Sequence, residues 1–566
     1  MKLFIAAAAA VLASVLTAAP AAARSIQPIG LGGRSLALPA LRGATVGHVS
    51  PSARIDVYVR LPGRRDAELD GFVDAVTAPE SPWFGRYLTP EQFGSYFGAD
   101  PFRYAAAVRA LQQHGFVIDE LPPNRTDIVA HASAENVEAF FATPLDLRVD
   151  RGREYYTNRY LPVVPPALAG AVVSGLDDYV QFHPMLRRDP NTVIGGRFSW
   201  GPDDVAAAYE LTPLYKEGLD GKGVTIANAT CGAAVPSDLA LFQKTFALPA
   251  APLVSTAEPT GSHLTTACGR TSYGNGESSL DSDWATAIAR EATFHQVVAA
   301  GPSNHDFDTV YSYIVNTLGH SVHVVTTSWG TCERDMKGTA SLTIDEKLLA
   351  QAKAEGQHWF SASGDAGTDD CQDGGTAVSV DFPGSSPYVM SVGGTNVKGR
   401  IVRGNVTEWL DETVWQASNS DGATGGGASI LYAKPRYQRG VTPNDGVRDV
   451  PDVALIADNV NDGLWAAQGG QVAGGWGGTS ESSPQWAGLL AIVEQRYHNA
   501  RIADPHARLY QLASSKAYHL LFHDILKGNN GIRDAYGNFP GYNAGPGFDL
   551  CTGWGSFIAD ALVRAY

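Results

Sequence analysis

Short apolar runs alternate with amphipathic stretches along this chain, and they fall into two successive sets. In the first set, Ile55–Val59 and Ile128–His131 have the pattern of strands, and Phe102–His114 and Ala134–Phe141 have the pattern of helices. Two consecutive β-α-β halves of this kind predict a small α/β sandwich of ferredoxin-like type. We expect this first domain to extend over residues 24–190.

The second set of apolar runs, over residues 198–566, repeats strand and then helix. Its strand candidates are Val224–Ala227, Val322–Trp329, His358–Ser363 and Tyr388–Val392, and its helix candidates are Asp283–Ala300 and Ile344–Ala354. Strands that alternate with helices predict a parallel sheet covered by helices on both faces. Ligand sites in such sheets gather at the carboxyl ends of the strands, which is where Trp329-Gly330 and Gly364-Asp365 fall.

The N-terminal segment has the order of a secretory signal. Lys2 precedes the apolar stretch Leu3–Thr17, and the small residues Ala21-Ala22-Ala23 follow as a cleavage site. No later segment reaches the run of about 18 apolar residues that spans a membrane. We therefore expect a signal peptide over residues 1–23 and a secreted, soluble mature protein. The charged, proline-bearing stretch Pro184–Arg197 separates the two domains, and within it Arg187–Pro190 predicts an exposed linker and a possible cleavage region.

Charge and cysteine content narrow the range of partners. The formal net charge is −16, and most of it lies beyond residue 190. Because phosphate binding needs positive charge, we expect no nucleic-acid partner. In an exported chain the five cysteines can form disulfides with one left over. Cys332 with Cys371 is one candidate pair and Cys231 with Cys268 is the next, although the sequence does not determine the connectivity.

Ser480 is the first candidate for chemistry, because it lies in a Gly-Thr-Ser turn that runs into an apolar helix. A serine hydroxyl is a weak nucleophile that needs an adjacent base, yet no His-Gly-Thr segment accompanies this one. About 200 residues upstream, Glu277 and Asp281 are four positions apart and would share one face of a helix. Two such carboxyls share a proton and split their apparent pKa values. The plainer interpretation is acidic residues that favour a helix N-terminus.

Two further segments carry acidic residues in functional patterns. Asp365 directly follows a predicted strand, where an aspartate is either a turn former or a functional acid. Near the C-terminus, Asp524 and Asp549 flank a glycine-rich stretch, and carboxylates with backbone carbonyls are the hard oxygen ligands that calcium prefers. The plainer interpretation of that stretch is a loop with helix-capping aspartates.

Together these segments resemble one family, the sedolisins or serine-carboxyl peptidases, over nearly the whole chain. The motifs that carry the resemblance are, in family order, Gly276–Asp281, Ser328-Trp329-Gly330 with Glu333, Ser363-Gly364-Asp365, Gly425–Ser429, Pro451-Asp452-Val453, Gly478-Thr479-Ser480 and Asp549–Gly555. Upstream, Arg86–Thr89 and the sandwich pattern resemble the activation propeptide of that family. Gly477 and Trp329 depart from the serine and tyrosine that are common in the family, and neither departure removes a reacting group.

The resemblance implies a subtilisin-like fold and a role for each catalytic candidate. Ser480 would be the nucleophile, Glu277 its general base, and Asp281 the residue that orients Glu277. Asp365 would be the acid of the oxyanion hole. The first domain would be a propeptide that inhibits the enzyme from within the same chain until it is cut between about residues 186 and 200.

The resemblance also implies binding residues. Substrate would be bound by Ser328, Trp329 and Gly330, with Trp329 bearing on substrate choice. One structural calcium ion would be held by Asp524, Asp549 and the carbonyl oxygens of Ile525, Gly545 and Gly547.

These roles are compatible only in acid. Glu277 must be ionised to accept the Ser480 proton, whereas Asp365 must be protonated to donate to an oxyanion. On reference pKa values both conditions hold at roughly pH 3–5, where a histidine base would be protonated. We therefore predict a secreted, monomeric acid endopeptidase that acts on proteins and peptides. A tripeptidyl aminopeptidase on the same scaffold, an ordinary subtilisin-type enzyme and an inactive calcium-binding module remain as alternatives.

Overall fold

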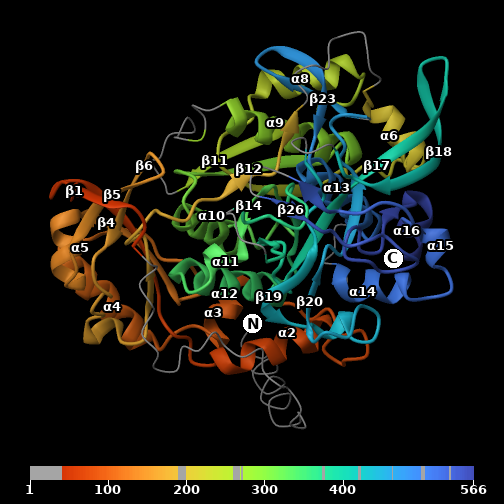
Figure 1. Ribbon diagram of the computed structural model, residues 1–566. Helices are drawn as coiled ribbons and strands as arrows, with labels where there is room; N and C mark the ends of the chain where they lie inside the picture. The colour runs from red at the N-terminus through yellow and green to blue at the C-terminus, as the bar shows by residue number, and fades with distance from the viewer. Residues whose placement is uncertain are drawn as a thin grey trace.

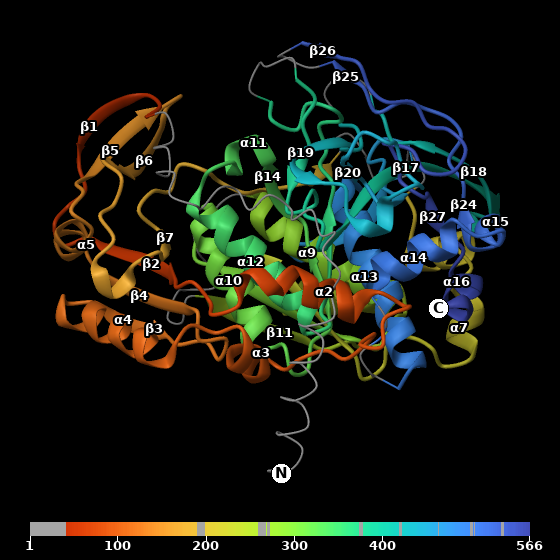
Figure 2. The same cartoon turned by 90° about the horizontal axis from the view of Figure 1, so that it is seen from below.

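The computed structural model describes residues 41–188, 199–258, 268, 272–372, 377–417, 422–461, 463–498, 502, 504–533 and 537–566. The expected signal peptide and the second half of the expected linker lie outside these residues. The described chain forms two α/β units that pack side by side (Figure 1, Figure 2). Across the described ranges, no helix combines the length and apolar character that a membrane span requires.

The N-terminal unit is built on a four-stranded antiparallel sheet of order β3-β4-β2-β7. Its strands are β2 (Arg54–Arg60), β3 (Val117–Glu120), β4 (Asp127–Ser133) and β7 (Val172–Ser174), and its main helices are α4 (Pro101–Gln113) and α5 (Ala134–Phe141). The chain order β-α-β-β-α-β with this strand order is the ferredoxin-like arrangement that the sequence predicts.

Several elements decorate this sandwich. They are a second sheet of β1 (Ala44–His48), β5 (Leu145–Asp150) and β6 (Arg153–Asn158), together with the helices α2 (Leu69–Thr77) and α3 (Pro90–Tyr96). The Thr89 side chain caps α3, since its hydroxyl accepts the Gln92 N–H.

The two faces of the N-terminal sheet have different partners, because successive side chains of a strand point to opposite faces. Val57 and Val59 of β2 join Leu111 and Phe141 in the core beneath α4 and α5. Tyr58, which lies between the two valines, instead joins a core cluster of the second unit. The sheet is therefore buried on both faces only while the two units stay together.

The second unit contains an eight-stranded sheet of order β11-β12-β10-β13-β15-β17-β18, with β21 pairing β17. The strands are β10 (Thr225–Thr230), β11 (Leu253–Glu258), β12 (Thr293–Ala299), β13 (Val324–Thr327), β15 (His358–Ala362), β17 (Val389–Val402), β18 (Asn405–Val414) and β21 (Val453–Ile456). All pairings are parallel except β17 with β18. The predicted parallel sheet is confirmed.

Helices cover both faces of this sheet. They are α9 (Ser272–Ile288) and α13 (Thr479–Arg496) on one side, and α10 (Asn304–Asn316) and α12 (Ala340–Ala354) on the other. Within β10, Ile226 packs with Leu280 of α9 and Trp486 of α13, whereas the next residue, Ala227, packs with the α10 and α12 cluster. The N-terminal unit docks on the α10 and α12 side (Figure 2).

The remaining elements lie around this framework. They include α6 (Pro202–Ala208), α7 (Thr212–Lys216), α8 (Pro236–Thr245), α14 (Pro505–Ala513), α16 (Ala559–Ala565), β19 (Gly427–Ala433), β20 (Val447–Val450) and β22 (Leu464–Gln468). Disulfides join Cys231 to Cys268 and Cys332 to Cys371, the two candidate pairs, and Cys551 is free and buried.

One element prediction is wrong. The sequence suggests a helix over Asp283–Ala300, but α9 ends at Ile288 and the strand β12 begins at Thr293. Because β12 lies between β10 and β11, it is nearly all buried, and a short buried apolar run has no period that separates strand from helix. The β-branched residues of β12, among them Val297 and Val298, are the signal that favours a strand.

Candidate active site

Ser480 lies at the start of α13, at the carboxyl ends of the central strands, and it is fully buried. The preceding turn depends on Gly478, whose φ of 103° lies in the left-handed region. A Cβ atom at Gly478 would lie 2.4 Å from the Met185 carbonyl oxygen and 2.7 Å from Asp365 Oδ2. These two oxygens therefore face the same small space beside the Ser480 backbone.

Glu277 and Asp281 lie one turn apart on α9, as the spacing predicts, and both are fully buried. Asp281 is held from two sides. Asn228 Nδ2 donates to its Oδ2 at 2.8 Å, and Ser328 Oγ donates to its Oδ1 at 2.6 Å. The sequence prediction missed Asn228, although a polar residue near the carboxyl end of a buried strand is a signal that could have found it.

The Glu277 carboxylate faces Ser480. Burial and the charge of Asp281 raise the pKa of Glu277 well above its ordinary value, while its contact with the Ser480 hydroxyl opposes that rise. Burial also raises the pKa of Asp281, against the hydrogen bonds from Ser328 and Asn228. Within the described residues, neither Glu277 oxygen nor Ser480 Oγ makes a hydrogen bond of standard geometry. The pair therefore favours a state that shares one proton.

Asp365 follows β15 and is held by the residue before the nucleophile. Its Oδ1 accepts the Thr479 N–H at 2.8 Å and the Thr479 hydroxyl at 2.9 Å. Its Oδ2 lies 3.5 Å from Arg187 Nε and faces the Met185 carbonyl oxygen across Gly478. Burial raises the pKa of Asp365 to about 6, although Arg187 and the Thr479 hydrogen bonds lower it. The site can therefore hold this carboxyl protonated in mild acid.

The end of the N-terminal unit runs through this site as an extended segment. The strand β8 (His183–Pro184) pairs antiparallel with β14 (Trp329–Cys332), and β9 (Arg187–Arg188) pairs antiparallel with β23 (Gln471–Gly477). Between these pairs, the Met185 N–H donates to the Ser328 carbonyl at 3.0 Å, and the Ser480 N–H donates to the Met185 carbonyl at 3.1 Å.

Of the expected exposed linker, Arg188 is exposed and Arg187 is half-buried, whereas Met185 and Leu186 just before it are buried. The sequence prediction used the charged side chains and prolines of this stretch. In the structure, backbone hydrogen bonds to two strand edges hold the segment in place. The candidate substrate-binding residues Ser328, Trp329 and Gly330 all lie along this segment, since they form or adjoin β14. Their roles remain predictions.

One glycine-rich loop contacts the carboxylates of Asp524 and Asp549, two of the candidate calcium ligands. The Gly547 N–H donates to both oxygens of Asp524 at 3.1 and 3.2 Å, and the Gly545 N–H donates to Asp549 Oδ2 at 3.1 Å. Both carboxylates are thus fixed to one glycine-rich loop, with Ile525 next to Asp524 in the chain. Two carboxylates would supply part of the all-oxygen coordination of calcium, and the three carbonyl ligands remain predictions.

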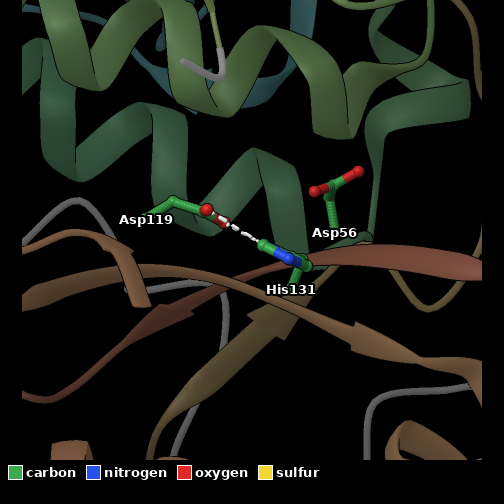
Figure 3. Close-up of side chains that lie close together, drawn as sticks. All are labelled: Asp56, Asp119 and His131. Carbon is green, nitrogen blue, oxygen red and sulfur yellow. Dashed lines mark hydrogen bonds and ion pairs between the residues drawn. The ribbon is translucent and has the colours of Figure 1, made fainter. Parts of the chain in front are cut away.

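Asp56, Asp119 and His131 form a separate cluster on the N-terminal sheet (Figure 3). The His131 ring lies 2.8 Å from an Asp119 oxygen. Arg54 approaches Asp56 at 2.7 Å and Asp119 at 3.7 Å, so a fixed cation already compensates the two carboxylates. We interpret this cluster as an ion-pair network, not as a metal site.

Two family models match this chain. Residues 42–179 match the model described as the pro-kumamolisin activation domain. Residues 255–555 match the model described as the subtilase family. The first match coincides with the ferredoxin-like unit, and the second covers most of the unit that carries Ser480.

Individual proteins match over both units. Sedolisin of Pseudomonas sp. (strain 101) is 31% identical over 90% of this chain and 86% of its own. Tripeptidyl-peptidase 1 of Mus musculus is 26% identical over 92% of this chain and 93% of its own. A solved structure of Pseudomonas sedolisin, described as a serine-carboxyl proteinase in complex with pseudo-iodotyrostatin, is 28% identical and superposes with a TM-score of 0.57. It covers 65% of this chain and 98% of that one.

Proposed function

Because this chain belongs to the sedolisin family of serine-carboxyl peptidases and carries an activation propeptide, we propose that it is a secreted, acid-acting endopeptidase that processes itself. The family match makes the chain a serine-type peptidase made as a zymogen. Acid action, cleavage within chains, export and calcium binding are the proposals that follow.

The observation that carries the proposal is the peptide segment beside Ser480. A carbonyl that accepts the N–H of the nucleophilic residue is in the position where a tetrahedral oxyanion would form. Met185 supplies that carbonyl, and antiparallel pairing holds the chain on both sides of it. The edges of β14 and β23 beside Ser480, which we call the cleft, therefore accept a continuous polypeptide in extended form.

The side chains around Ser480 supply the chemistry in our proposal. Glu277 takes the hydroxyl proton as Ser480 Oγ attacks the carbonyl carbon. Asp281, which accepts hydrogen bonds from Asn228 and Ser328, orients Glu277. The Ser480 N–H and protonated Asp365 stabilise the oxyanion. Glu277 then gives the proton to the leaving amine, and water hydrolyses the ester in the same two steps.

Cleavage within chains is favoured over tripeptidyl release by the contacts upstream of Met185. A tripeptidyl aminopeptidase needs a free amine three residues before the cut. Here Phe182 is the fourth residue before the peptide bond that follows Met185. It is 2% exposed, and its N–H donates to the Pro302 carbonyl at 2.7 Å. Gln181 bridges Ser303 one residue further upstream. The cleft continues past the point where a tripeptidyl site would end.

Export and calcium binding rest on other features. The N-terminal signal pattern and the two disulfides support secretion, because disulfides persist in oxidising compartments. Asp524 and Asp549 would hold the ion with carbonyls of Ile525, Gly545 and Gly547, and calcium would tie this loop together. The ion is structural in this proposal and takes no part in the reaction.

The test is hydrolysis of an N-terminally acetylated peptide at pH 5 by the matured protein. We expect internal cleavage, detected by mass spectrometry of the products, and loss of cleavage in Ser480→Ala. Ser482→Ala is the matched control, because that hydroxyl donates to backbone carbonyls of β21 and not to the carboxyl pair. Failure to cut any blocked peptide, with release of tripeptides from free ones, would make the chain an aminopeptidase.

A further inference from the structure

The contacts of residues 182–188 specify which bond lies at the nucleophile. Met185 both donates its N–H to Ser328 and accepts the Ser480 N–H through its carbonyl. The next pairing, between Arg187 and Gly477, begins two residues later. The peptide bond between Met185 and Leu186 is therefore the bond that the two strand pairs present to Ser480.

Aromatic rings enclose the side chain of Phe182. Its ring centroid lies 4.7 Å from that of Phe307 and 6.3 Å from that of Phe382, and Phe307 in turn lies 6.0 Å from Trp329. These three residues come from α10, β16 (Asp381–Phe382) and β14. We call them the aromatic pocket. Because it lies in the catalytic unit, it remains after the propeptide leaves.

We propose that residues 182–188 are a built-in substrate, that the chain cuts itself between Met185 and Leu186, and that the aromatic pocket selects an aromatic residue four positions before the cut. This inference rests on the proposed function. The bond lies at the upstream edge of the region where the sequence places processing.

Neighbouring contacts support the same register. A Cβ atom at Gly330 would lie 2.5 Å from the terminal methyl carbon of Met185, so this glycine leaves room for a long unbranched side chain. Leu186 is 9% exposed and belongs to the core cluster that contains Trp476. Both side chains that flank the bond are thus buried in the catalytic unit, as those of a bound substrate are.

The reaction balances as a hydrolysis. Ser480 Oγ bonds to the Met185 carbonyl carbon while its proton passes to Glu277. The bond to the Leu186 nitrogen then breaks as that nitrogen takes the proton. Water next adds to the ester carbon, gives its proton to Glu277, and releases Ser480 Oγ, which recovers the proton. The products are a Met185 carboxylate and a Leu186 amine.

The processing bond is tested with the full chain incubated at pH 5. Intact mass and N-terminal sequencing should find Leu186 as the first new N-terminus, and Ser480→Ala should leave the chain uncut. A first new N-terminus elsewhere, in a protein that still cuts blocked peptides, would overturn this inference and leave the proposed function standing. No cleavage of either the chain or peptides would instead count against both.

The aromatic pocket is tested with an acetylated peptide of residues 181–188 and the matured protein. Replacing the phenylalanine that corresponds to Phe182 by alanine should lower kcat/KM by about tenfold or more, because burying that side chain favours binding. The matched control replaces Gln181 by alanine and should change kcat/KM less than about twofold. Equal losses for the two peptides would contradict a selective pocket.

A protein-side variant completes the test. Phe307→Ala should reduce the preference for phenylalanine over alanine at that position, measured as the ratio of the two kcat/KM values. The ratio is informative even if the variant is less stable, because both substrates meet the same protein. An unchanged ratio would show that the pocket does not select.

Discussion

Glu277, Asp281 and Asp365 are buried together, and burial moves the pKa of each upward. The expectation of activity at pH 3–5 used reference values, so the structure moves that window upward. In the proposed mechanism, activity would be lost as Asp365 ionises, and in the uncut chain burial raises the pKa of Asp365 to about 6. The lower edge lies above the ordinary glutamate range, because the base must lose its proton before it can act.

Asp365→Asn separates hydrogen-bond donation from titration. Thr479 already satisfies Oδ1 with two donors, so an amide would place its oxygen there and its NH2 toward the Met185 carbonyl. We expect kcat/KM of this variant to stay level from pH 6 to 8, where the wild-type value falls about tenfold per pH unit.

Asp365→Ala is the matched control and should lose about 100-fold to 1,000-fold at every pH, as expected for a missing oxyanion donor. If Asp365→Asn lost activity above pH 6 in parallel with the wild type, another group would set the upper edge.

The sequence pointed to the proposed reacting residues but not to the residues that hydrogen-bond to them. Ser480, Glu277, Asp281 and Asp365 belong to motifs with a chemical pattern. Asn228 and Thr479 were not assigned roles, since hydrogen bonds between distant segments leave no local pattern.

At the level of elements, the candidate calcium loop links Asp524 near β24 (Phe522–His523) to Asp549 through Gly545 and Gly547. We expect the melting temperature of the uncut Ser480→Ala chain to fall when a chelator replaces calcium. A ligand present at about 100 times its Kd stabilises by about 2.7 kcal/mol.

Asp549→Asn should abolish this difference between calcium and chelator. Asp203→Asn should keep it, because the Asp203 side chain is 84% exposed and far from the loop in sequence. Equal melting temperatures with calcium and with chelator in the parent chain would contradict the site.

A second element-level feature joins the two units. Glu258 at the end of β11 faces Glu120 of β3, and burial, reinforced by the Glu120 charge, raises the pKa of Glu258 to about 8. Because the folded pKa is raised, the protonated pair stabilises the docked state in acid. That stability is lost as the pH rises from the ordinary glutamate pKa through about 8.

Glu258→Gln, which cannot ionise, should therefore reduce the fall in melting temperature between pH 5 and pH 9 in the Ser480→Ala chain. Glu135→Gln is the control, since Glu135 is exposed on the N-terminal unit. If the melting temperature of Glu258→Gln fell as much between pH 5 and pH 9 as that of the parent chain, the Glu258–Glu120 pair would not be the source of this pH dependence.

The elements themselves were mostly predictable, and β2 and α5 have clear periodicity. The strand β12 was not, since burial on both faces removes the period. The pairing of residues 183–188 with the cleft was not predictable either, because backbone pairing does not depend on side-chain pattern.

At the scale of the whole molecule, the ferredoxin-like sandwich and the segment 183–188 contact different parts of the second unit. The ferredoxin-like sandwich packs on α10 and α12, where Asn124 donates to Gln351 at 3.0 Å and Ser174 contacts Asp308. Among the described residues of the N-terminal domain, the segment 183–188 that follows the sandwich pairs with the strand edges beside Ser480. The propeptide thus inhibits by occupying the cleft with its end while the sandwich anchors it. The order of the two units was predictable from sequence, but this docking was not, because it depends on surfaces formed only after folding.

Several buried carboxyl groups have raised pKa values and so contribute more stability to the zymogen in acid than at neutral pH. Burial raises the pKa of Glu333 and of Glu346 to about 7, and the pKa of Asp345 well above its ordinary range. Each group stabilises the fold below its unfolded pKa, and that stability is lost as the pH rises through the folded value. Asp452 and Asp504 have lowered pKa values, because Arg448 and Lys353 respectively oppose the cost of burial, so mild acid does not weaken them.

We therefore expect the melting temperature of the Ser480→Ala chain to be higher at pH 5 than at pH 8, measured by calorimetry at constant ionic strength. A melting temperature that is higher at pH 8 than at pH 5 would contradict the account of buried, protonated acids.

The most direct test of a serine served by carboxyl groups is the pH dependence of kcat/KM for the matured wild-type protein on a blocked peptide. The predicted profile has its maximum below about pH 6 and falls about tenfold per pH unit above it, as Asp365 ionises. A profile that rises through pH 6 and levels off near pH 7.5, as a histidine base would produce, would contradict the account.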